Sequence, residues 1–192
     1  MRFIVVPGNG GCGVDTMSAN WYGWFHDAIT SRGHSCLVPN WPDPYCCKRS
    51  IWEPFILNDL ALGPDDVVVG HSSGALLAMR LLEGERKIKG AVLVACAHTD
   101  LGDENEKASE YFDLPWQFDK MRNNADWVVQ FHSSDDHLIP VAEGRFVASE
   151  IEKGSGNAEY CYRELEGEGH FFRPCEEIMK EIDKRTGGRE EE

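Results

Sequence analysis

Short apolar runs alternate along this chain with longer segments in which apolar and polar residues mix. The runs are rich in valine, isoleucine and leucine and span about four to eight residues, which indicates buried strands. Strands are predicted over residues 2–6, 35–38, 65–70, 88–95, 126–131 and 158–163. Helices are predicted over residues 21–32, 50–61, 73–83, 141–152 and 175–185. This alternation predicts a three-layer α/β/α fold, in which helices cover both faces of a mostly parallel sheet of about six strands.

One interval breaks this rhythm. Residues 97–124 separate two predicted strands by more residues than a single helix needs. The interval is polar at first, around Asp103 and Glu106, and aromatic later, around Tyr111. A long excursion beyond the carboxyl end of a strand is where such folds place a cap over a site, although a long helical connection packed on the sheet has the same pattern. We therefore expect one domain over residues 1–186 that carries a short cap.

The composition limits the partners that the chain can bind. Its 192 residues suffice for one domain, and 33 acidic against 19 basic residues give a net charge of −14. Nucleic acids and anionic membranes require basic patches, so we expect neither partner. No run approaches the ~20 apolar residues of a membrane span. Residues 187–192, in which acidic side chains follow glycine, are expected to form a disordered tail.

The seven cysteines bear on the compartment and on metal binding. Their odd number, together with a first apolar run too short for a signal peptide, predicts reduced thiols in a cytoplasmic protein. Cys46 and Cys47 are adjacent and no Cys-x-x-Cys pattern occurs, so we expect no metal and no cofactor. A metal held by His132, Asp135 and His137 is the alternative that this spacing leaves open.

The most specific motif lies between a predicted strand and a predicted helix. Residues 70–74 have the sequence Gly-His-Ser-Ser-Gly. A Gly-x-Ser-x-Gly turn in this context is typical of the nucleophile elbow of α/β-hydrolases, where a strained turn lifts one serine clear of the sheet. The frame selects Ser72 over Ser73, because the corresponding positions around Ser73 hold His71 and Ala75. A glycine-rich turn whose serines cap a helix is the alternative.

A serine nucleophile needs a base and an acid that orients the base, and in this fold both follow the serine in the chain. Two adjacent aspartates, Asp135 and Asp136, follow the predicted strand over 126–131. This loop commonly has an Asp-x-x-Ile/Val-Pro spacing, which only Asp136 keeps, with Ile139 and Pro140. We therefore expect Asp136 to be the acid and the other aspartate to stabilise a turn or a helix end.

His170 is the predicted base. It follows the last predicted strand in a loop whose neighbouring glycines allow a tight turn back over the sheet edge. His71 adjoins the predicted nucleophile, but neighbouring side chains diverge, so we expect it in the pocket wall or in packing. Trp41 and Trp116 lie after a strand and in the predicted cap. Both are candidates for pocket walls, with core packing as the alternative.

The intermediate of acyl transfer also needs two N–H donors for its oxyanion. One donor is expected to be the backbone N–H of Ser73, the residue after the nucleophile. The other is expected from the glycine-rich loop over residues 7–13, which follows the first predicted strand. We expect the backbone of Asn9 to supply it, with Gly10 as the alternative.

Several longer blocks resemble the retinoblastoma-binding protein 9 family, which consists of small serine hydrolases with the α/β-hydrolase fold. The similar blocks are residues 7–11, 21–24, 41–44, 50–55, 70–80, 100–106, 115–117 and 169–171. The resemblance implies a triad of Ser72, Asp136 and His170, and activity on small ester- or amide-type substrates. The family name refers to a Leu-x-Cys-x-Glu motif that can engage the retinoblastoma protein. Residues 60–64 here are Leu-Ala-Leu-Gly-Pro, which argues against binding to that protein.

The sequence thus predicts a hydrolase that acts on a small molecule and forms an acyl-enzyme. Two alternatives share the scaffold. One is a protein-binding module, because a fold alone does not imply activity. The other is an acyltransferase that uses the same three residues.

Overall fold

The structure, a computed structural model, describes residues 1–187. Six parallel strands form one sheet in the order β2-β1-β3-β4-β5-β6. The strands are β1 (Arg2–Val6), β2 (Ser35–Leu37), β3 (Asp66–His71), β4 (Gly90–Val94), β5 (Trp127–Ser133) and β6 (Glu159–Leu165). The predicted α/β class and strand number are confirmed. The sheet is parallel throughout, so the carboxyl ends of all its strands lie at one edge.

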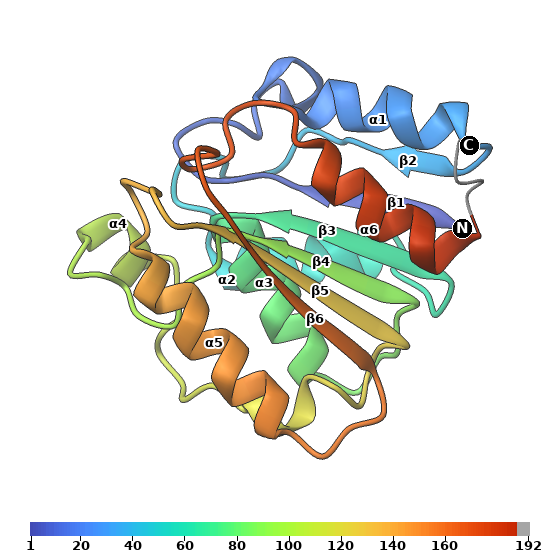
Figure 1. Cartoon of the computed structure of the whole chain (residues 1–192). Helices are drawn as coiled ribbons and strands as arrows, with labels where there is room; N and C mark the ends of the chain where they lie inside the picture. The colour runs from blue at the N-terminus through green and yellow to red at the C-terminus, as the bar shows by residue number, and fades with distance from the viewer. Residues whose placement is uncertain (188–192) are drawn as a thin grey trace.

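Helices cover both faces of this sheet (Figure 1). One face carries α1 (Tyr22–Ser31) and α6 (Glu176–Thr186), and the other carries α2 (Arg49–Pro54), α3 (Ser73–Glu83) and α5 (Val141–Lys153). The chain also contains 3₁₀ turns at Thr16–Ser18 and Phe118–Lys120, and a π turn at Phe55–Asp59 that continues α2. Of the predicted tail, only Gly187 is described, and it ends α6 in the left-handed conformation; residues 188–192 lie outside the described part.

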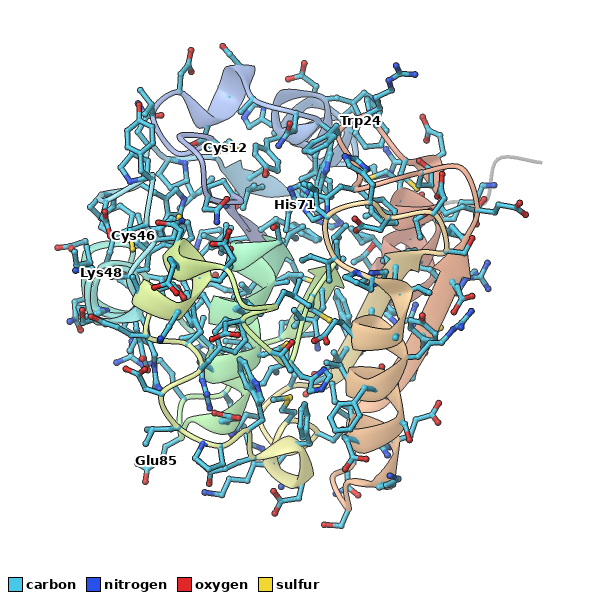
Figure 2. The ribbon with its side chains drawn as sticks, turned by 90° about the vertical axis from the view of Figure 1, so that its left-hand side faces the viewer. Cys12, Trp24, Cys46, Lys48, His71 and Glu85 are labelled. Carbon is cyan, nitrogen blue, oxygen red and sulfur yellow. The ribbon has the colours of Figure 1, made fainter. Side chains whose placement is uncertain are left out.

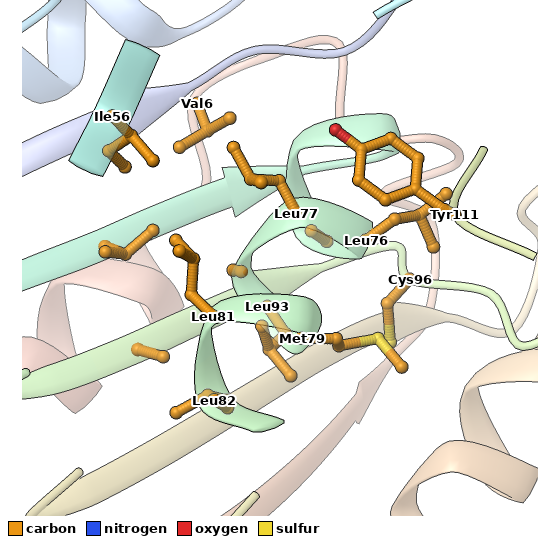
Figure 3. Close-up of a cluster of buried hydrophobic side chains, with 14 of the residues drawn as sticks. Val6, Ile56, Leu76, Leu77, Met79, Leu81, Leu82, Leu93, Cys96 and Tyr111 are labelled. Atoms are coloured by element: carbon orange, nitrogen blue, oxygen red, sulfur yellow. The ribbon is translucent and has the colours of Figure 1, made fainter. Parts of the chain in front are cut away.

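The two faces of the sheet have separate hydrophobic cores, because successive side chains of a strand point to opposite faces. On β1, Phe3 and Val5 pack with α1 and α6, whereas Ile4 and Val6 pack with α3. Helix α3 is buried along nearly its whole length. Figure 3 shows its leucines packed between Ile56, Val6 and Leu93. The start of α3 is therefore held firmly against the sheet.

Residues 97–124 contain α4 (Glu104–Ala108) and a 3₁₀ turn but no strand. Arg80, buried on α3, fastens this excursion to the core. Its guanidinium donates hydrogen bonds to the carbonyls of Tyr111, Leu114 and Pro115 and lies 3.7 Å from the ring centre of Trp116. The second half of the excursion is thus packed on α3. No helix in the described part of the chain is long and apolar enough to cross a membrane.

The packing of α3 predicts the stability of a leucine variant. Leu77 is fully buried, whereas Leu114 is 60% exposed. Leu77→Ala should lower the free energy of unfolding by ~2–5 kcal/mol, because it removes buried methyl groups and leaves a cavity. Leu114→Ala should stay within about 0.5 kcal/mol of the parent protein. Urea unfolding followed by circular dichroism measures both, and equal effects of the two substitutions would contradict this account of the core.

Candidate active site

Ser72 lies at the tight turn between β3 and α3. Its backbone has φ 55° and ψ −121°, a strained conformation for a residue with a side chain. The flanking glycines permit the turn by close backbone contact. A Cβ on Gly70 would lie 2.3 Å from the carbonyl oxygen of Gly74, and one on Gly74 would lie 2.1 Å from that of Val6. The predicted strand, turn and helix are all present, and the strain falls on Ser72.

His170 and Asp136 meet beside this turn, although they come from loops after different strands. The Nδ1 atom of His170 lies 2.8 Å from Oδ2 of Asp136, and both side chains are buried. The second carboxylate oxygen accepts hydrogen bonds from the backbone N–H groups of Leu138 and Ile139, at 2.9 and 3.0 Å. The predicted Asp-x-x-Ile spacing therefore forms a turn that fixes the carboxylate.

The surroundings of Asp136 favour its charged form. Burial opposes ionisation, but the hydrogen bonds from His170, Ile139 and Leu138 outweigh it and hold the pKa of Asp136 below its usual value. An ionised Asp136 accepts a hydrogen bond from Nδ1–H of His170, so Nε2 of the imidazole, when neutral, carries a lone pair that can accept a proton.

Asp135 has a different position from its neighbour. Its Oδ1 accepts hydrogen bonds from the hydroxyl of Ser133 and from the backbone N–H groups of Gly167 and Gly169. These hydrogen bonds, that from Ser133 first, lower the pKa of Asp135. The side chain thus ties the end of β5 to the loop that carries His170. This is the turn-stabilising position expected for the aspartate that does not orient the base.

A cavity of about 510 Å³ opens beside Ser72. Ser72 and His170 both line it, whereas Asp136 lies behind His170 and does not. The apolar wall consists of Leu76, Ala97, Leu101, Leu138, Ile139 and Phe172. A volume of this size suits a small organic substrate, and its apolar wall suits an apolar portion of that substrate.

A family model described as serine hydrolase matches residues 3–171. The chain belongs to the serine hydrolase family. It is 41% identical over 152 residues to the serine hydrolase RBBP9 of Rattus norvegicus, an alignment that covers 79% of this chain and 80% of that protein. The predicted family resemblance is confirmed.

Solved structures share the fold of this hydrolase at low sequence identity. The ydeN gene product of B. subtilis is 18% identical, with a TM-score of 0.81 and coverage of 97% of this chain and 98% of that one. Est1E from Butyrivibrio proteoclasticus is 13% identical, with a TM-score of 0.70 and coverage of 97% and 86%. At these identities, the likeness establishes the α/β architecture.

The expected oxyanion donors of the hydrolase, Ser73 and Asn9, both line the cavity beside Ser72. Ser73 is the first residue of α3, where helix geometry leaves backbone N–H groups without partners inside the helix. Asn9 also lines the cavity, whereas its predicted alternative Gly10 does not. The N–H of Gly8 donates to the hydroxyl of Tyr22 at 3.0 Å and is therefore occupied. The arrangement favours Asn9 over Gly10.

Glu106 joins α4 to Asn9 and Ser73, a contact that the sequence pattern did not indicate. Its Oε1 accepts hydrogen bonds from Nδ2 of Asn9 at 2.6 Å and from the hydroxyl of Ser73 at 3.3 Å. Burial raises the pKa of Glu106, while the hydrogen bonds from Ser73 and Asn9 oppose that rise. Asp103 lines the same cavity, and among residues 1–187 no lysine or arginine does. The cavity therefore disfavours anionic groups.

Two tryptophans differ from the expectation that they would line the pocket. Trp41 packs on Trp52 with ring centres 4.7 Å apart, and its Nε1 donates to the carbonyl of Val5. Trp116 covers Arg80, and its Nε1 donates to the carbonyl of His98. Neither lines the cavity. Each indole buries a large apolar surface and places its one polar atom on a backbone carbonyl, which favours the interior over a wet wall.

The structure does not form the metal site that was the alternative for this region. Nε2 of His132 lies 3.0 Å from the carbonyl oxygen of Ile139, and Asp135 is bound to Ser133 and the loop glycines. Within residues 1–187, no three His, Cys, Asp or Glu side chains are grouped so as to hold a metal ion.

His71 lines the inner end of the cavity and is almost entirely buried. Figure 2 shows it within the molecule, whereas Lys48 and Glu85 lie at the periphery. It was expected in the pocket wall or in packing, and each of its ring nitrogens also has a polar contact.

Proposed function

We propose that this hydrolase cleaves a small ester or amide by forming an acyl-enzyme on Ser72, with His170 as general base and Asp136 as the acid that orients it. The observation that carries the proposal is the buried 2.8 Å contact between His170 and Asp136, with His170 lining the same cavity as the strained Ser72. A hydroxyl, an imidazole and a carboxylate in this order are the parts that acyl transfer requires.

The reaction has two steps. In each step His170 first accepts one proton and then donates it. In the first, Ser72 Oγ bonds to the carbonyl carbon of the substrate and its proton passes to Nε2 of His170. The imidazolium then gives this proton to the departing alcohol or amine, which leaves an ester on Ser72. In the second step, His170 takes a proton from water, the resulting hydroxide attacks the ester, and the serine leaves with the proton restored.

Two features of the site stabilise charge during these steps. The carboxylate of Asp136 faces Nδ1 of His170 and stabilises the imidazolium when it forms. The backbone N–H groups of Ser73 and Asn9 are the proposed donors to the oxyanion. Because they are held by a helix start and a glycine-rich loop, they need little reorganisation when the charge develops.

The lining of the cavity indicates the class of substrate. Asp103 and Glu106 face it, and no lysine or arginine of the described residues lines it to balance them. We therefore propose neutral or cationic substrates with an apolar portion against Leu138, Ile139 and Phe172. Water is the proposed acceptor of the acyl group. An excess of alcohol or amine that captured all of the acyl group at the expense of water would identify an acyltransferase instead.

Covalent labelling separates the two neighbouring serines. Ser72→Ala should abolish labelling by a fluorophosphonate and lower kcat by several orders of magnitude, because the attacking oxygen is gone. Ser73→Ala removes a hydroxyl that contacts Glu106 and should keep the label. Gel fluorescence and the rate of ester hydrolysis measure the two properties. Labelling that persists in Ser72→Ala but disappears in Ser73→Ala would reverse the assignment.

The two adjacent aspartates provide a matched pair of substitutions. Asp136→Asn should lower kcat by about 10⁴, because the amide favours the wrong tautomer of His170. Asp135→Asn weakens hydrogen bonds to the His170 loop and should act mainly through stability. Turnover is compared at equal folded fraction, determined by urea unfolding. A larger loss of kcat in Asp135→Asn would be incompatible with the proposal.

The rate should fall as the pH is lowered. The pKa of Asp136 is held below its usual value, and burial lowers the pKa of His71 to about 3, so neither changes its charge in mild acid. We expect kcat/KM for a neutral ester to fall as acid protonates His170, since imidazolium cannot accept the serine proton.

A chelator is the control for the pH profile, because a metal-bound water would also produce a basic optimum. EDTA should leave the rate unchanged. Activity that EDTA removes and added Zn²⁺ restores would contradict the serine mechanism.

A further inference from the structure

A continuous line of hydrogen bonds runs beneath Ser72 through two fully buried side chains that the mechanism above does not use. Tyr22 of α1 and His71 at the end of β3 are 0% and 1% exposed. The hydroxyl oxygen of Tyr22 lies 2.7 Å from Nδ1 of His71. The backbone N–H of Gly8 donates to the same hydroxyl at 3.0 Å. Nε2 of His71 lies 2.9 Å from the carbonyl oxygen of His170.

The donors and acceptors fix the proton positions along this line. The carbonyl of His170 can only accept, so Nε2 of His71 carries the proton and Nδ1 is the acceptor. The hydroxyl of Tyr22 therefore donates to Nδ1. Its oxygen keeps two lone pairs, which accept from the N–H of Gly8 and from Nδ2 of Asn20 at 3.3 Å. Each of these groups has a partner, and only one direction of donation satisfies them all.

Both side chains keep these protonation states at neutral pH. Burial raises the pKa of Tyr22, so the phenol retains its proton. Burial, and secondarily the nearby His170, lowers the pKa of His71 to about 3, so its imidazole stays neutral. The ring centres of His71 and His170 are 5.1 Å apart, close enough that a charged His71 would oppose the imidazolium required on His170. A neutral His71 is thus a hydrogen-bonding group that does not compete as a base.

The line connects two backbone segments that line the same cavity as Ser72. Gly8 immediately precedes Asn9, the proposed oxyanion donor, and the carbonyl of His170 belongs to the proposed base itself. We propose that Tyr22 and His71 are positioning residues. They hold the glycine-rich loop over residues 7–13 and the loop that carries His170 in fixed positions relative to Ser72. This inference deepens the proposed function and rests on it.

The Tyr22 hydroxyl gives the sharpest test. Tyr22→Phe removes one oxygen and keeps the ring that packs on Trp21 and His71. We expect kcat to fall about 10- to 100-fold, the loss that a small misplacement of reacting groups produces. KM should change little, because the cavity walls keep their side chains and the effect arises in the transition state.

A second tyrosine is the matched control for the loss of a buried hydroxyl. The hydroxyl of Tyr160, on β6, donates to Oε1 of Gln130 at 2.6 Å, and neither residue lines the cavity. Tyr160→Phe should lower stability without lowering kcat, measured at equal folded fraction. A wild-type kcat in Tyr22→Phe, or an equal loss in both variants, would overturn the proposal.

The His71 end of the line is tested by partial rescue. His71→Ala removes both contacts and should lower kcat more than Tyr22→Phe does. His71→Gln restores an amide donor toward the carbonyl of His170 and should recover part of that loss. No difference in kcat between the folded Ala and Gln variants would overturn the positioning role of His71.

One measurement keeps this inference distinct from the proposed function. Nitrogen-15 NMR of the unliganded protein reports which ring nitrogen of His71 carries the proton, whatever the protein catalyses. We expect the neutral Nε2–H form, with Nδ1 hydrogen-bonded. The Nδ1–H form or a charged ring at neutral pH would overturn the inference even if Ser72 is the nucleophile. Conversely, activity that survives in Ser72→Ala would overturn the proposed function and leave the NMR result standing.

Discussion

The contact between the backbones of β1, the turn at Ser72 and the first turn of α3 sets the geometry of the whole site. Two glycines allow it, because a Cβ on Gly70 or Gly74 would overlap a carbonyl oxygen of the neighbouring segment. The same contact forces Ser72 into a conformation with positive φ, which costs about 1–3 kcal/mol. Burial of nearly every side chain of α3 between the sheet and α2 offsets this strain. The folded core thus holds the serine in a position that it would not adopt in an isolated turn.

The loops after β5 and β6, which carry Asp136 and His170, must then reach Ser72 at the end of β3. Strand β6 lies at the sheet edge, and the loop after it carries His170 back toward β3. Asp135 binds the glycines of this loop, Asp136 binds the imidazole, and His71 binds the carbonyl of His170. Three polar side chains therefore hold a segment whose own glycines make it flexible. Glu106 likewise holds a loop in place, because it joins α4 to Asn9 and Ser73.

Much of the fold could be predicted because parallel strands buried on both faces leave continuous apolar runs. The largest departure is the helix predicted over residues 50–61, which is an α-helix only to Pro54 and continues as a π turn to Asp59. Strand β6 extends two residues beyond its predicted end, to Leu165, since an edge strand need not be apolar. The elbow could be predicted from its glycines. The contacts of Glu106 with Asn9 and of Tyr22 with His71 could not, because they join residues 97 and 49 positions apart and leave no local pattern. The positions of Trp41 and Trp116 could not be predicted for a related reason. A tryptophan in a loop has the same sequence pattern whether its indole packs into the core or lines a cavity.

In the proposed reaction the strained Ser72 carries the acyl group between the two steps. Mass spectrometry of the protein, quenched during turnover of a slowly hydrolysed ester, detects such an intermediate. We expect a mass increase equal to the acyl group, located on the peptide that contains residues 70–74 and specifically on Ser72, which disappears once the ester is exhausted. Turnover without any acylated protein, or an acyl group on a residue other than Ser72 that forms and decays at the rate of turnover, would contradict it.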